Sequence, residues 1–282
     1  MAHYPLACRA ERSEAEMDVN GVSLHVEDHG SGPAVVLLHG WPDSTALWRH
    51  QIPVLVANGL RVIAFDLRGF GRSDKPQEVS AYTLPTSVAD VVGVLDHLGI
   101  AKAHLVGHDW GAALAWMTAC LQPDRVDRLV VLSVPHPAAP RTLRQREMSW
   151  YQLFFQFEGV AEASLQHKDW ALFREVLRGD GDIERYVEDL SRPGALTASL
   201  NWYRANLAPR PPSDSPTRLP LVQSPTLALW STGDHFLDGA RVEASADFVE
   251  AEWRYERIDG ASHWIPLDAP ERVNDLLIEW LT

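Results

Sequence analysis

Short apolar runs alternate with longer stretches of mixed polar and apolar residues along most of this chain. The apolar runs have the length of buried strands, whereas the mixed stretches repeat their apolar positions with the period of a helix. This alternation predicts an α/β fold, in which helices cover both faces of a mostly parallel sheet. We expect strands at residues 22–27, 34–38, 62–65, 104–106, 128–132, 226–230 and 252–257, and helices at 47–56, 86–98, 111–121 and 271–281.

The alternation stops between residues 135 and 219. Prolines cluster at both ends of this segment, and its interior is helical in pattern and rich in large apolar side chains. A helical insertion between prolines, placed before the last two strands, predicts a cap over the sheet, because proline restricts the backbone at each junction. We therefore divide the chain into an N-terminal extension (1–17), an α/β core (18–134 and 220–282) and a helical cap (135–219).

Composition and charge exclude several kinds of partner. The 282 residues carry a formal net charge of −13, so nucleic-acid phosphates and anionic membranes are unfavourable partners. The chain has no apolar run of about 18 residues that could span a bilayer, and residues 1–17 lack the apolar core of a signal peptide. Two cysteines form no disulfide framework, which fits a cytoplasmic location. No metal-ligand spacing or phosphate-binding loop is present, so we expect no cofactor; monomer and homodimer both stay open.

The clearest chemical signal is the pentapeptide Gly107-His108-Asp109-Trp110-Gly111, between a predicted strand and a predicted helix. Such a glycine-flanked turn presents a nucleophile at its tip, and small residues are needed because the turn is strained and the backbones approach closely. Here an aspartate replaces the usual serine. A carboxylate can attack saturated carbon and leave an alkyl ester on the enzyme, so Asp109 predicts reaction with an epoxide or an alkyl halide. The simpler interpretation is that Asp109 only caps the helix.

Two downstream residues complete a candidate triad. Asp234 follows the strand predicted at 226–230, and His263 follows the strand predicted at 252–257. The order nucleophile, acid, histidine is typical of α/β hydrolases, and all three residues lie at the carboxyl ends of strands. We expect His263 to activate the water that hydrolyses the ester on Asp109, while Asp234 holds the imidazole tautomer. Asp238 is the competing candidate for the acid.

Attack of water on that ester would place negative charge on a carboxyl oxygen, which needs hydrogen-bond donors. One expected donor of this oxyanion hole is the backbone N–H of Trp110, directly after the nucleophile. The second is expected from the loop at residues 39–42, His-Gly-Trp-Pro, and most directly from the N–H of Trp41. Pro42 would restrict Trp41 to an extended backbone. The alternative is that the His-Gly pair only makes a tight turn.

These motifs resemble those of the soluble epoxide hydrolases of the α/β-hydrolase fold. The similarity covers the chain from about residue 20 to residue 281 and includes the 39–42 loop, the aspartate elbow and the segments around Asp234 and His263. Residues 149–156 and 200–206 resemble the two family segments that each carry a cap tyrosine. The resemblance implies that Tyr151 and Tyr203 hydrogen-bond the epoxide oxygen while Asp109 attacks carbon from the other side. A phenol can stabilise or protonate the alkoxide that forms.

Large side chains near these motifs predict an apolar, aromatic-lined cavity for an apolar or aromatic epoxide. An acidic substrate is disfavoured by the acidic chain and by Trp110 and Ala113, which occupy positions where fluoroacetate-type dehalogenases carry arginines. The expected lining residues are Trp41, Pro42, Trp110, Phe154, Trp202, Phe236, Leu237 and Trp264.

Two other functions stay open. A haloalkane dehalogenase uses the same fold and nucleophile but holds a halide with N–H donors; Trp110 could supply one, whereas the common asparagine after the His-Gly pair is Trp41 here. A non-enzymatic receptor or scaffold is the third possibility, because fold alone does not determine function. Such a protein would be expected to lose the nucleophile, the histidine or the cap donors, and this chain retains a candidate for each.

Overall fold

The computed structural model describes residues 12–209 and 218–282. These residues form one eight-stranded sheet with the order β1-β2-β4-β3-β5-β6-β7-β8. The pairs β1–β2 and β2–β4 are antiparallel and the other pairs are parallel, which confirms the predicted mostly parallel sheet. The strands are β1 Arg12–Val19, β2 Val22–His29, β3 Ala34–Leu38, β4 Arg61–Phe65, β5 Ala103–His108, β6 Val126–Leu132, β7 Thr226–Ser231 and β8 Trp253–Ile258.

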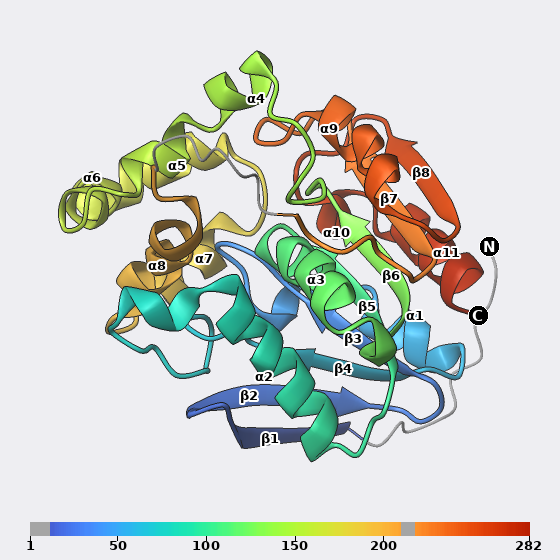
Figure 1. Cartoon of the computed structure of the whole chain (residues 1–282). Helices are drawn as coiled ribbons and strands as arrows, with labels where there is room; N and C mark the ends of the chain where they lie inside the picture. Colours follow the sequence, from blue (N-terminus) through green and yellow to red (C-terminus); the bar gives the residue numbers. More distant parts are fainter. Residues whose placement is uncertain (1–11, 210–217) are drawn as a thin grey trace.

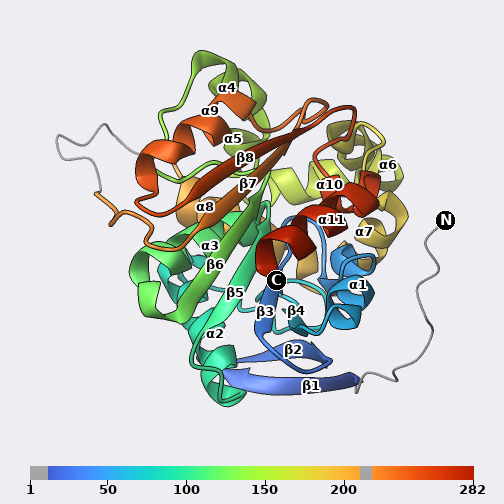
Figure 2. The same cartoon turned by 90° about the vertical axis from the view of Figure 1, so that its right-hand side faces the viewer.

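Helices cover both faces of this sheet. Figure 2 shows α2 (Leu84–His97) and α3 (Trp110–Leu121) on one face, and α1 (Ile52–Ala57) and α11 (Pro270–Leu281) on the other. Because it lies between two helical layers, the central strand β5 is buried along its whole length, and an apolar run is what such a strand requires. The remaining core elements are α9 Gly239–Glu243, α10 Ile265–Asp268 and the 3-10 turns η1 Thr45–Trp48, η2 Val79–Tyr82, η3 Pro123–Arg125 and η4 Ala244–Phe248.

A group of helices lies between β6 and β7 in the sequence, where the insertion was predicted. These helices are α4 Leu143–Met148, α5 Trp150–Phe154, α6 Val160–Leu177, α7 Ile183–Leu190 and α8 Ala195–Leu207. Figure 1 shows them gathered along one side of the molecule, in green to orange. Buried polar contacts fix them to the core, since Asp43 accepts hydrogen bonds from Tyr186 (2.8 Å) and Arg185 (2.5 Å) of α7. None of the helices in the described ranges is long and apolar enough to cross a membrane.

Two predictions about the N-terminal half are wrong. Part of the expected extension, from Arg12 onward, is strand β1, in which Met17 and Val19 are buried while most other side chains are exposed. An edge strand with so few buried positions gives little apolar signal. The helix expected at 47–56 is two elements, η1 and α1, because Pro53 is tolerated in the first turn of α1 but not in the interior of one continuous helix. Residues 1–11 and the prolines at 211, 212 and 216 lie outside the described residues, so the cap boundary at 219 stays a prediction.

Candidate active site

The aspartate elbow is the sharp turn between β5 and α3. Asp109 has φ 51° and ψ −121°, a sparsely populated conformation that the surrounding packing holds in place. A Cβ on Gly107 would lie 2.3 Å from the carbonyl oxygen of Gly111, and a Cβ on Gly111 would lie 2.0 Å from that of Leu38. Both positions therefore require glycine, because the backbones around the turn are in direct contact.

Gly111→Ala should lower the free energy of unfolding by about 1–3 kcal/mol and displace the carboxylate of Asp109, because the clash is with backbone that cannot move alone. The loss is measured by urea denaturation together with hydrolysis rates. Gly21→Ala is the control: a Cβ there would meet no atom within 4 Å, and the positive φ of Gly21 is the only source of strain. We expect the control to lose some stability and to keep its activity. Full activity in Gly111→Ala would contradict the assigned role of the elbow packing.

The three triad candidates meet at the carboxyl ends of β5, β7 and β8. Nδ1 of His263 lies 2.8 Å from Oδ2 of Asp234, and Nε2 of His263 lies 3.6 Å from Oδ2 of Asp109. The other oxygen of Asp234 accepts the backbone N–H groups of Phe236 (2.7 Å) and Leu237 (2.9 Å). Asp234 thus holds the imidazole with the proton on Nδ1, so that Nε2 faces Asp109.

Asp238, the other candidate for the triad acid, makes its hydrogen bonds elsewhere. Its side chain accepts the N–H of Ala240 at the start of α9 (3.3 Å) and the hydroxyl of Thr142 (2.7 Å). It therefore caps a helix and ties the segment before α4 to the core. The carboxylate that contacts His263 is that of Asp234.

The charges of the triad are strongly coupled. Burial of His263 opposes the imidazolium, but the carboxylates of Asp234 and Asp109 outweigh this effect and raise the pKa of His263 to about 10. Burial likewise disfavours the carboxylate of Asp109, yet the neighbouring His263 dominates and the pKa of Asp109 is lowered. The resting site therefore holds an ionised nucleophile beside a protonated histidine at neutral pH.

His108, inside the elbow, supports the catalytic loop and was missed as a functional residue at the sequence level. Its Nε2 donates to the backbone carbonyl of His263 (2.9 Å), and the hydroxyl of Ser133 donates to the same oxygen (3.2 Å). Burial lowers the pKa of His108 to about 4, so it is neutral at pH 7. The loop that carries His263 is thus held by the segment next to Asp109.

The loop after β3 places a backbone donor on the nucleophile. The N–H of Trp41 donates to Oδ1 of Asp109 (2.7 Å), and the following Trp41–Pro42 peptide is cis. His39 fixes this loop, because its Nδ1 donates to the carbonyl of Gly40 (2.9 Å) while its Nε2 accepts the N–H of Leu67 (3.0 Å). Trp110, the other expected donor, is the first residue of α3, directly after Asp109.

The two tyrosines that the resemblance singled out come from different helices and meet at Asp109. Tyr151 on α5 and Tyr203 on α8 are buried, with ring centroids 6.0 Å apart, and both line the cavity that Asp109 borders. Burial raises the pKa of each phenol, and the charge of Asp109 adds to the increase. Both hydroxyls therefore stay protonated across the neutral range and can donate. Gln152 Nε2 donates to the Tyr151 hydroxyl (3.3 Å).

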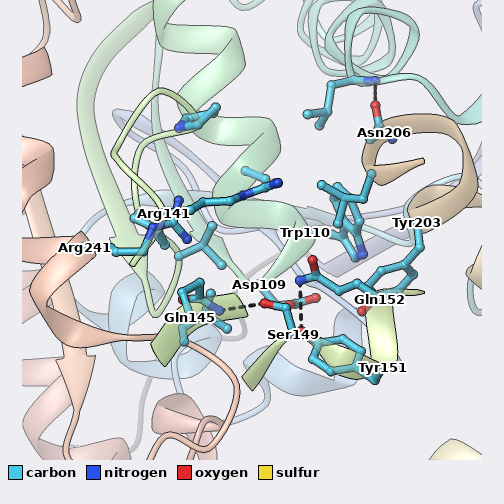
Figure 3. Close-up of a pocket in the computed structure, with 17 residues that line it drawn as sticks. Asp109, Trp110, Arg141, Gln145, Ser149, Tyr151, Gln152, Tyr203, Asn206 and Arg241 are labelled. Atoms are coloured by element: carbon cyan, nitrogen blue, oxygen red, sulfur yellow. Dashed lines mark hydrogen bonds between the residues drawn. The ribbon is translucent and has the colours of Figure 1, made fainter. Parts of the chain in front are cut away.

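A cavity of about 240 Å³ extends from Asp109 between the core and the inserted helices (Figure 3). Of the expected lining residues, Trp110 and Leu237 border it, and Trp41, Phe236 and Trp264 border a small pocket of about 10 Å³ on the His263 side. The other expected lining residues, Pro42, Phe154 and Trp202, border neither the cavity nor the small pocket. The indole of Trp202 packs behind that of Trp110, with ring centroids 5.5 Å apart.

The cavity is also more polar than the sequence predicted. Its wall includes the polar side chains of Arg141, Gln145, Ser149, Gln152, Asn206 and Arg241. Ser149, Gln152 and Asn206 lie in the two segments that resemble the family's cap-tyrosine segments, whereas Arg141, Gln145 and Arg241 belong to none of the motifs recognised in the sequence. The predicted apolar, aromatic lining therefore describes only part of this wall, which also carries polar and charged side chains.

Known proteins are similar to this chain over nearly its whole length. A model of the alpha/beta hydrolase fold matches residues 33–270. The chain belongs to the α/β-hydrolase fold family. A family relative from Bacillus subtilis, AB hydrolase superfamily protein YfhM, is 35% identical and covers 94% of this chain and 96% of its own length. Epoxide hydrolase A from Mycobacterium tuberculosis is 33% identical and covers 96% of this chain and 97% of its own length.

Solved structures of epoxide hydrolases have the same fold as this chain. The crystal structure of epoxide hydrolase A from Mycobacterium thermoresistibile has a TM-score of 0.81 and 31% identity, and covers 96% of this chain and 98% of that one. This coverage includes both the sheet of this chain and the helices inserted between β6 and β7. The predicted resemblance to the epoxide hydrolases of the α/β-hydrolase fold family is confirmed.

Proposed function

We propose that this chain hydrolyses epoxides to vicinal diols through an alkyl ester formed on Asp109. The observation that carries the proposal is the set of groups around one carboxylate: a backbone donor from Trp41 on Oδ1, His263 beside Oδ2, and two buried phenols in the same cavity. The relatives named epoxide hydrolases support the same reaction. An epoxide with an apolar or aromatic portion fits the lining from Trp110, Tyr203 and Leu237.

In the first step, Oδ2 of Asp109 attacks an epoxide carbon, since Oδ1 is bound to the N–H of Trp41. The bond between that carbon and the epoxide oxygen breaks, and the oxygen takes a proton from Tyr151 or Tyr203. A neutral phenol suits this role because the alkoxide is a far stronger base than a halide. The products of the step are the ester and a tyrosinate.

Ester formation prepares the second step by changing the charge beside His263. Esterified Asp109 no longer carries the negative charge that helps raise the pKa of His263, so this pKa must fall. The imidazolium proton then restores the tyrosinate to a phenol, which leaves His263 neutral. His263 becomes a base at the stage of the cycle that needs one.

In the second step, neutral His263 takes a proton from water while the hydroxide adds to the ester carbonyl. The oxyanion on Oδ1 is held by the N–H of Trp41 and by that of Trp110. Collapse of this intermediate expels the diol oxygen, which takes the proton from His263. The acid left on Asp109 then loses its proton to His263, and the starting ion pair is restored.

Replacing either tyrosine by phenylalanine should slow alkylation of Asp109 about tenfold, and replacing both should slow it about 100-fold or more, since general acids contribute 10²–10⁴-fold. The rate is measured in single turnovers with styrene oxide. Tyr255→Phe on β8, outside the cavity, is the control and should react as wild type. A double variant that alkylates at the wild-type rate would remove the phenols from the mechanism.

A two-substrate assay separates this function from the alternatives. The indole Nε1 of Trp41 donates to Ser199 (3.2 Å), so of the indoles of Trp41 and Trp110 only that of Trp110 is available to a halide, which needs more than one N–H donor. We therefore expect wild-type protein to form diol from styrene oxide and no bromide from a bromoalkane. Bromide release without diol would establish a dehalogenase, and neither product would indicate a non-enzymatic protein.

A further inference from the structure

Two arginines face the substrate cavity from segments about 100 residues apart in sequence. Arg141 precedes α4, and Arg241 lies on α9. Figure 3 shows both on one side of the cavity, across from Tyr203. The proposed alkylation of Asp109 uses the carboxylate and the two phenols. It assigns no role to Arg141 or Arg241.

Arg241 is a buried cation that the protein does not neutralise. Its side chain is only 7% exposed, and two of its donors are held by backbone carbonyls: Nε by Pro140 and Nη2 by Ala139, both at 3.0 Å. Neither Arg241 nor Arg141 makes an ion pair with an acidic side chain of the described ranges. The carboxylate of Asp238, whose charge acts on Arg241, accepts hydrogen bonds from Thr142 and from the start of α9.

Arg141 is exposed and Arg241 is buried, and their like charges repel each other when no anion lies between them. Burial and the charge of Arg141 together lower the pKa of Arg241 to about 10, and the charge of Asp238 only partly opposes them. Arg241 therefore remains charged at pH 7. An anionic group between them would relieve the repulsion, and the planar fork of guanidinium donors matches a carboxylate.

We propose that Arg141 and Arg241 bind an anionic substituent of the substrate, so that the preferred epoxides carry a carboxylate remote from the oxirane ring. This inference rests on the proposed epoxide hydrolysis and narrows its substrate class. It also reverses the expectation that acidic substrates are disfavoured, which rested on the net negative charge of the chain and on Trp110 and Ala113 beside the nucleophile. An anion bound beside the nucleophile would hinder attack, whereas one held by these arginines leaves the oxirane free to reach Asp109.

The probe is a matched pair of substrates, the para-carboxylate and the para-carboxamide of styrene oxide. Wild-type enzyme should show a KM about tenfold lower for the carboxylate, because a charge-assisted pair to arginine is lost in the amide. Arg141→Gln should lower the ratio of kcat/KM, carboxylate over carboxamide, by about tenfold, and Arg241→Met should lower it further. The exposed Arg144 on α4 supplies the control, since Arg144→Gln removes the same charge outside the cavity and should keep the ratio.

Arg241 also anchors the segment before α4, so Arg241→Met could unfold. Its thermal unfolding is therefore recorded. If Arg241→Met does not fold, the result for Arg141→Gln alone decides the test. An unchanged ratio in Arg141→Gln, or the same fall in Arg144→Gln, would overturn the inference. Hydrolysis of the carboxamide and of styrene oxide itself shows separately that the proposed function holds. If wild type hydrolyses none of the three epoxides, the proposed function fails and this inference with it.

Discussion

Asp109→Asn should reduce hydrolysis of styrene oxide by a factor on the order of 10⁴ or more, because an amide cannot form the ester through which the reaction proceeds. The fold should be retained, since the amide oxygen can still accept the N–H of Trp41. Asp109→Ala is measured as well, because hydrolysis of the asparagine amide could restore the aspartate, whereas alanine cannot revert. Diol formation and far-UV circular dichroism are measured together. Asp247→Asn on the exposed turn η4 is the matched control and should keep wild-type activity. Wild-type turnover by Asp109→Ala would remove the nucleophile from the account.

The same variant tests the proposed change in the charge state of His263. The pKa of about 10 depends on two carboxylates, and Asp109→Asn removes one of them. We expect an NMR titration of the imidazole to show a pKa well below the wild-type value. Because the folded-state pKa of His263 is raised above 6.5, its ion pairs contribute stability fully below pH 6.5 and lose it as the pH rises through about 10. The variant should lose part of that contribution. An unchanged pKa would mean that ester formation does not convert His263 into a base.

His263→Gln should leave alkylation of Asp109 possible but slow hydrolysis of the ester on the order of 10³-fold, since water then lacks its base. Enzyme mixed with excess styrene oxide should gain the mass of one epoxide, and peptide mapping should place the addition on the segment that contains Asp109. His235→Gln supplies the control, because His235 is exposed and should leave no adduct. The first step is expected to be slower than in wild type, because His263 also orients the carboxylate.

The elbow and the triad could be predicted because each depends on local sequence. A glycine-flanked turn and a residue directly after a strand are fixed by neighbours in the chain, and parallel strands bring their carboxyl ends to one edge. The chain order then indicates which residues meet. The sequence could not distinguish Asp234 from Asp238 as the triad acid, because both residues follow β7. The structure distinguishes them, since the path of the loop turns Asp234 toward His263.

The cavity could not be predicted in the same way, because its wall is built from distant segments. Trp202 and Tyr203 are neighbours on α8, yet Trp202 donates to the carbonyl of Arg68 in the core while Tyr203 faces Asp109. Aromatic character alone does not distinguish them. Arg141 and Arg241 share no motif, and only the packing of α9 against the segment before α4 brings them to one cavity.

The most direct test of the ester on Asp109 is a single turnover in water enriched in oxygen-18, with enzyme in excess over styrene oxide. The account predicts a diol whose new oxygen is unlabelled, because it comes from the carboxylate, and an Asp109 peptide that has gained one heavy oxygen. Label that enters the diol in this first turnover, with none in the Asp109 peptide, would show that water attacks the epoxide directly.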